Sequence, residues 1–82
     1  MNRHPNLMPL SALEPGAAAR VVALEGDAAN RRRLLEMGFL RGERLLIHKA
    51  APLGDPVEIV IKGYHLSLRR EEGACILVER EA

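Results

Sequence analysis

Two apolar runs on either side of a turn cluster constrain this chain more than any other feature. The second run alternates, so Val57, Ile59 and Ile61 share one face of a strand. The first run carries Leu45 and Ile47 in the same alternation. Directly opposed residues in a hairpin lie on the same face, so pairing Ile47 with Ile59 sends all five side chains into one core. A register shifted by one residue would expose half of that core.

The turn cluster between the two runs, residues 51–56, reads Ala-Pro-Leu-Gly-Asp-Pro. Proline restricts φ and glycine tolerates positive φ, so this composition marks a loop. The outer face of the hairpin is also apolar at Leu46 and Val60, and Leu53 lies at the loop tip. Contiguous exposed apolar area tends to mark an interface. Unless strand curvature or the N-terminal segment covers it, this outer face is the best candidate for a partner surface.

One helix is expected in the chain, directly before the hairpin. It begins after Asp27, whose side chain can supply the N-cap oxygen, although Asn30 is an alternative cap. It ends before Gly38, which stands where a left-handed residue commonly closes a helix. In that arrangement Leu34 and Phe39 form the apolar contact of a Schellman cap.

Three further strands are expected, at residues 18–24, 64–69 and 74–79, with a polar turn at residues 69–73. Ser11 is expected to cap a single helical turn near the N-terminus. Five short strands bury their edges best by curling into a small barrel. The predicted fold is therefore all-β with one short helix, an SH3-like small β-barrel, with an OB-type barrel as the alternative.

Length and composition predict one small domain at residues 8–82 after a flexible tail at residues 1–7. A formal net charge of +1 and only two aromatic residues argue against nucleic-acid binding. The single cysteine, Cys75, excludes an internal disulfide and fits a reducing compartment. The longest apolar stretches fall well short of the roughly 20 residues that span a bilayer. These observations predict a cytoplasmic protein that does not span a membrane.

The sequence does not contain a set of residues in a pattern typical of an enzyme active site. Ser11 and Ser67 are not in a nucleophile-elbow setting, and no glycine-rich loop precedes a Lys-Ser/Thr pair. The chain is therefore not expected to be an enzyme.

Metal ligation is not assigned either, because no CxxC or paired-histidine spacing is present. His65 and Cys75 are the candidates, since they lie on successive predicted strands and could approach each other. No cofactor is expected to be required, and adventitious binding of Zn²⁺ or Fe²⁺ is the alternative. The wider set of potential ligands is His4, His48, His65, Cys75, Glu58, Glu71 and Glu72.

Three consecutive arginines open the predicted helix, where positive charge opposes the helix dipole. These arginines either form a solvent-exposed face or bind an acidic partner surface or lipid phosphates. Arg32 and Arg33 are the members of this cluster taken as candidate partner contacts.

Several short motifs occur in order along the chain: Leu10-Ser11-x-Leu13 with Pro15-Gly16, Arg32-Arg33-Leu34-Leu35-x-Met37-Gly38, the 51–56 loop, Gly63-Tyr64-x-Leu66-x-Leu68-Arg69, and Glu72 followed by Ile76-x-Val78. Together, from about residue 8 to residue 79, they resemble the FeoA family of bacterial ferrous-iron transport systems. Two departures are Gly73, where the family usually has alanine, and a Met-Gly-Phe variant of its Leu-Gly-Leu pattern.

The resemblance implies an SH3-like barrel and a cytosolic, non-catalytic accessory protein. Such a protein would bind and regulate the cytosolic part of a FeoB-type, GTPase-coupled iron transporter, either from the cytoplasm or held peripherally at the inner membrane by that partner. Two other functions stay open: a divalent-metal sensor or carrier, and a stand-alone relative of the C-terminal domain of iron-dependent repressors. A homo-oligomer is also left open. The candidate partner-binding residues are Arg32, Arg33, Leu46, Leu53, Gly54, Asp55 and Val60.

Overall fold

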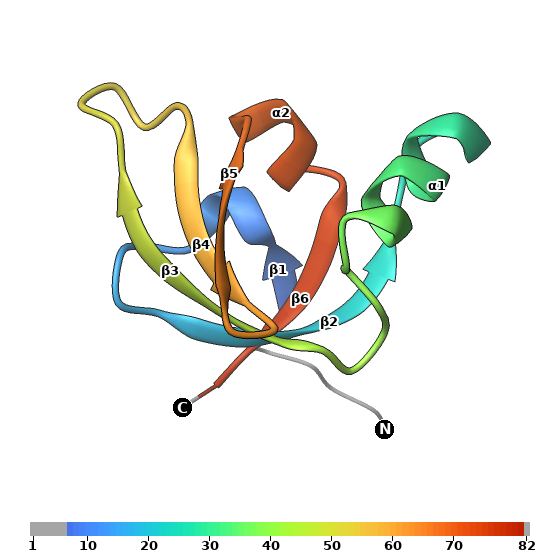
Figure 1. Cartoon of the computed structure of the whole chain (residues 1–82), viewed down its shortest axis with the longest axis horizontal. Coiled ribbons are helices and arrows are strands. Elements are labelled where there is room, and N and C mark those ends of the chain that lie inside the picture. Colours follow the sequence, from blue (N-terminus) through green and yellow to red (C-terminus); the bar gives the residue numbers. More distant parts are fainter. Residues whose placement is uncertain (1–6, 82) are drawn as a thin grey trace.

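The computed structural model describes residues 7–81. Within that range a six-stranded antiparallel sheet curls around an aliphatic core, and its strands follow the order β1-β6-β2-β3-β4-β5 (Figure 1). The elements are β1 (Leu7–Pro9), the 3-10 turn η1 (Leu10–Ala12), β2 (Ala18–Leu24), α1 (Ala28–Glu36), β3 (Arg44–Ala50), β4 (Val57–Ile61), β5 (Tyr64–Leu68), α2 (Arg70–Gly73) and β6 (Ile76–Arg80).

The central hairpin, β3 and β4, has the register that the alternation predicts. Ile47 pairs with Ile59, and both side chains are almost fully buried. Beyond Ile47 the pairing shifts, because His48 is inserted as a β-bulge and Lys49 takes the place opposite Glu58. A bulge bends its strand and sharpens the local twist, which helps a small sheet to curl.

The second hairpin joins β4 to β5 through a two-residue turn, Lys62 and Gly63. Both residues have positive φ, 54° and 82°. A type I′ turn requires this conformation at both positions, and its twist matches that of the strands it joins. The tight turn sets the register in which Val60 pairs with His65.

Helix α1 is capped at both ends as the sequence predicts. The Asp27 carboxylate accepts a hydrogen bond from the Asn30 N–H at 2.8 Å, so Asp27 is the N-cap. Gly38 has φ of +108°, and the Phe39 N–H donates to the Leu34 carbonyl at 3.2 Å. These are features of a Schellman cap, and they carry the Phe39 side chain into the core.

Strand β1 is a finding that the sequence did not predict. Leu7, placed at the end of the expected tail, pairs with Glu79 of β6, while residues 1–6 of that tail lie outside the described residues. The strand has three residues and ends at Pro9, which cannot donate a ladder hydrogen bond. Its partner is remote in sequence, so no local pattern indicates it.

Two local predictions were wrong. The expected polar turn after β5 contains the short helix α2, whose residues are too few and too polar for an apolar periodicity to appear. Ser11 caps nothing, because it lies inside the 3-10 turn whose N-cap is Pro9, and that turn has no side-chain cap. Leu10, the first residue of that turn, and Leu13, its C-cap, are nevertheless buried, as expected.

The barrel core is aliphatic except for one phenylalanine. It draws side chains from strands β2 to β6, from the 3-10 turn and from the end of α1, so these elements stabilise one another through shared burial. The buried apolar residues are Leu10, Leu13, Ala17, Ala19, Val21, Leu34, Phe39, Leu45, Ile47, Val57, Ile59, Ile61, Leu68, Ile76 and Val78.

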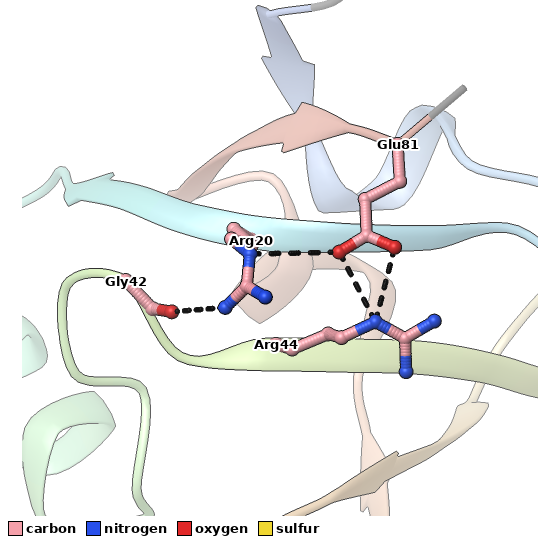
Figure 2. Close-up of polar contacts among 4 residues, drawn as sticks. All are labelled: Arg20, Gly42, Arg44 and Glu81. Atoms are coloured by element: carbon pink, nitrogen blue, oxygen red, sulfur yellow. Dashed lines mark hydrogen bonds and ion pairs between the residues drawn. The ribbon is translucent and has the colours of Figure 1, made fainter.

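A polar cluster fastens the end of β6 to the two strands beyond it (Figure 2). The Arg44 Nε lies 3.0 and 3.1 Å from the two Glu81 oxygens, and the Arg20 Nε lies 3.6 Å from Glu81. Arg20 also donates to the Gly42 carbonyl at 3.0 Å. Exposed pairs of this kind contribute about 0–1 kcal/mol each, so the cluster adds register specificity more than stability.

Candidate functional site

The outer face of the central hairpin places two candidate partner residues side by side. Leu46 and Val60 are directly paired across β3 and β4, and both are half-buried. Leu53, at the tip of the β3–β4 loop, is 95% exposed, more than any other large apolar residue described. That loop projects beyond the barrel (Figure 1). An aliphatic side chain this exposed has no role in the core of the isolated domain.

The loop that carries Leu53 is anchored at its base. The Asp55 carboxylate accepts a hydrogen bond from the Arg70 N–H at 2.9 Å, which ties the loop to the start of α2. Gly54 has φ of +83°, and a Cβ built there would lie 3.3 Å from the Arg70 guanidinium. Gly54 and Asp55 therefore have a structural explanation: they shape and hold the loop on which Leu53 is presented.

The two candidate arginines have different surroundings. Arg33 forms an ion pair with Glu72, a carboxylate that is only 8% exposed. The other oxygen of Glu72 accepts the Arg69 N–H at 3.0 Å, so Arg33 helps to fix α2 against α1. Arg32 is exposed and has no ion-pair partner among residues 7–81. Of the two, only Arg32 keeps its charge available for a partner.

The structure does not bring the candidate ligands His65 and Cys75 together. His65 lies on β5 and Cys75 in the turn that precedes β6, and β2, β3 and β4 lie between β5 and β6 in the sheet. Cys75 packs against the core and lines a polar groove of about 470 Å³ that also includes Asp27, Arg33 and Glu72. His65 lies on the outer face of the sheet, beside His48 and Glu58.

A second apolar surface was missed by sequence reasoning. Leu35 of α1 is 46% exposed and lines a groove of about 330 Å³ between α1 and β2, together with Val22 and Leu24. The available signal was the Leu34-Leu35 pair. Adjacent residues point about 100° apart on a helix, so both cannot enter the core, and Leu34 occupies it.

A titratable ion pair joins the first connecting loop to the end of β6. Arg80 donates hydrogen bonds to the Glu14 carboxylate, and this lowers the pKa of Glu14 below its ordinary 4.5. A carboxylate whose pKa is lower in the folded state stabilises the fold above the unfolded pKa. That contribution is lost as the pH falls through the folded pKa.

We therefore expect Glu14→Gln to flatten the acid limb of the stability curve. Wild-type protein should exceed the variant in unfolding free energy near neutral pH, and the difference should shrink as the pH falls below about 4.5, where carboxyl groups protonate in unfolded chains. Urea unfolding at several pH values between 7 and 3 measures this. If the difference in unfolding free energy stays constant over that range, the Glu14–Arg80 ion pair does not account for it.

Among residues 7–81, no helix has the length and apolar character required to cross a membrane.

Comparison with known proteins identifies close relatives of this chain. The FeoA domain model matches residues 8–80. The Fe²⁺ transport protein A/Fe²⁺ transporter FeoB fusion protein of Porphyromonas gingivalis is 47% identical over 72 residues. That match covers 88% of this chain and 8% of the fusion protein, so the chain spans less than a tenth of that relative's length.

Solved structures with the same fold include two FeoA proteins. The solution structure of FeoA from Chlorobium tepidum is 41% identical, with a TM-score of 0.82 over 92% of this chain and 71% of that protein. The zinc complex of FeoA from Stenotrophomonas maltophilia, described as a prokaryotic SH3 domain protein, is 28% identical. Its TM-score is 0.77 over 90% of this chain and 95% of that one. The fold is therefore SH3-like, as the strand pattern predicted.

Proposed function

This chain belongs to the FeoA family, and on that premise we propose that it is a non-catalytic accessory protein of ferrous-iron uptake. It binds the cytosolic part of a FeoB-type transporter and regulates it. The observation that carries this proposal is the fusion protein of Porphyromonas gingivalis, in which a segment 47% identical to this chain is part of the same polypeptide as a FeoB transporter. A fused domain is held at high effective concentration beside its partner, which a separate chain must achieve by affinity.

The loop tip and the outer face are the surface that we assign to this contact. Leu53 is 95% exposed on a loop held by the Asp55–Arg70 hydrogen bond, so little ordering of the loop is needed on binding. Leu46 and Val60 form a second apolar contact further along the hairpin, separated from the loop by Glu58 on the same face. An aliphatic anchor of this kind suits an apolar pocket on the partner.

Regulation by such a domain follows from differential affinity. If the chain binds one conformation of the transporter's cytosolic part more tightly than another, it shifts the population toward that conformation. The shift is limited by the affinity ratio, and it requires no chemistry in the bound chain. The domain then regulates the transporter by binding alone, according to which conformation it binds.

The decisive experiment measures binding of the purified chain to the cytosolic part of the cognate FeoB-type transporter. Leu53→Glu should weaken this binding at least tenfold, about 1.4 kcal/mol, because a carboxylate would have to be desolvated in an apolar contact. Leu46→Glu and Val60→Glu should act in the same direction. Transporter GTPase rate and Fe²⁺ uptake, with and without the chain, then report regulation.

Leu40→Glu is the matched control, because Leu40 is 45% exposed on the connection between α1 and β3, away from the loop. It should bind like the wild type. The half-buried positions also require a melting curve, so that loss of folding is not mistaken for loss of contact. Wild-type affinity in Leu53→Glu, with no change in GTPase rate or uptake on adding the chain, would contradict the proposal.

A further inference from the structure

Three side chains on the outer face of the sheet form a cluster that the interface proposal does not use. His48, Glu58 and His65 each offer one ligand atom, and these atoms all lie within 4.8 Å of one another. The two imidazole rings meet edge to face, with centroids 5.2 Å apart. The residues come from three neighbouring strands, β3, β4 and β5.

Strand register and one irregularity bring these side chains together. Val60 pairs with His65 and Glu58 pairs with Ser67, so Glu58 and His65 are diagonal neighbours on one face. Diagonal neighbours in an antiparallel pair are within reach of long side chains. His48 is the inserted residue of the β3 bulge, and a bulge re-aims the side chain that it inserts. The cluster is therefore built into the sheet rather than placed on a loop.

The donor atoms of this cluster are not engaged by other groups. Among residues 7–81, neither imidazole and neither oxygen of Glu58 has an ion pair or a hydrogen bond. By contrast, the carboxylates of Glu14, Glu43, Glu72 and Glu81 all form ion pairs. A ligand that reached Glu58 would break no existing interaction of that carboxylate.

Two imidazole nitrogens and one carboxylate oxygen are a donor set with a defined preference. Imidazole suits Zn²⁺ and Fe²⁺, and a two-histidine, one-carboxylate set is used for both. Bonds of about 2.0–2.2 Å in a tetrahedral site place the ligand atoms about 3.3–3.6 Å apart. Because both histidines are exposed, side-chain rotation alone can close the present separation of up to 4.8 Å.

We propose that His48, Glu58 and His65 bind one divalent transition-metal cation of the Zn²⁺/Fe²⁺ class. Three protein ligands leave at least one coordination position for water or for a donor on another molecule. Val60, the register partner of His65, belongs to the proposed docking face, so the bound cation would lie next to it. The inference itself does not depend on the partner, because it concerns the isolated chain.

The test is calorimetric titration of the tag-free, chelator-treated full chain with Zn²⁺, with visible absorption of Co²⁺ as a report on coordination. Wild-type protein should bind one ion per chain. His48→Ala and His65→Ala should each weaken Zn²⁺ at least tenfold, because even residues that only support a ligand are worth about 10–100-fold in affinity. Glu58→Gln should weaken it and change the Co²⁺ spectrum.

Cys75→Ser and His4→Ala are the matched controls, since they remove the other cysteine and histidine donors and should leave both readouts unchanged. Melting curves without metal check that each variant is folded. Absence of saturable Zn²⁺ binding, or wild-type binding by a His48→Ala/His65→Ala double variant, would overturn the site. Either result would leave the transporter-binding experiment unaffected, so the two proposals fail separately.

Discussion

Phe39→Ala is expected to reduce the free energy of unfolding by about 3–5 kcal/mol. Phe39 is fully buried, and its backbone closes α1 through the hydrogen bond to Leu34. Removing the ring takes away the only aromatic side chain in the described core and leaves a cavity among aliphatic neighbours. A β-rich barrel collapses into such a cavity only partly, because strand pairing holds its backbone in place.

The loss is large relative to the stability of a small domain. Native domains typically have about 5–15 kcal/mol in total, and at this size each kcal/mol shifts the melting temperature by about 4–8 °C. Thermal and urea unfolding followed by circular dichroism measures the change. Phe39→Leu keeps part of the side-chain volume, so its unfolding free energy should lie between those of the wild type and Phe39→Ala. It remains measurable if the alanine variant does not fold.

Leu40→Ala is the neighbouring control, because Leu40 is half-exposed. It should change stability by less than about 1 kcal/mol. If Phe39→Ala and Leu40→Ala reduce the unfolding free energy by the same amount, the end of α1 does not contribute to the core as the structure indicates.

Glu72→Ala is expected to reduce the free energy of unfolding by about 2–3 kcal/mol. Most of this comes from the Arg69 N–H, which loses a charged acceptor in a part-buried position. The ion pair with Arg33 adds less, since the Arg33 side chain is 61% exposed and solvent screens it. Both interactions fix α2, to which Asp55 anchors the loop that carries Leu53.

Two variants separate these contributions. Glu72→Gln keeps an acceptor for the Arg69 N–H but loses the charge, so its cost should be intermediate. Glu71→Ala removes an exposed carboxylate from the same turn of α2 and should cost less than about 1 kcal/mol. Urea unfolding of the three variants decides the matter. Equal costs at Glu71 and Glu72 would mean that burial of Glu72 contributes nothing.

Most of the fold could be predicted because its signals are local. Alternation at Val57, Ile59 and Ile61 defines which face is buried, and the requirement for one core then sets the pairing of Ile47 with Ile59. Asp27 and Gly38 bound the helix because capping depends on residues a few positions apart. These features require no knowledge of distant contacts.

The candidate site was only partly predictable. Leu46, Leu53 and Val60 were identified because apolar residues at outward-facing or loop positions are visible in the sequence. The structural roles of Arg33 and Asp55 were not, because their partners, Glu72 and Arg70, are remote in sequence. A carboxylate or guanidinium is as compatible with a solvated surface as with such a contact until the partner is in place.

The sequence by itself determined which residues face inward, where the helix begins and ends, and which family the chain resembles. Only the tertiary structure decided that β1 pairs with β6, that Glu72 is shared by Arg33 and Arg69, and that His48 and His65 come within reach of each other and of Glu58. The physical reason is the sequence separation of the interacting residues. Period-two alternation specifies a face, but it does not encode a one-residue bulge or the closure of a sheet, and these two features bring distant side chains within a few ångströms.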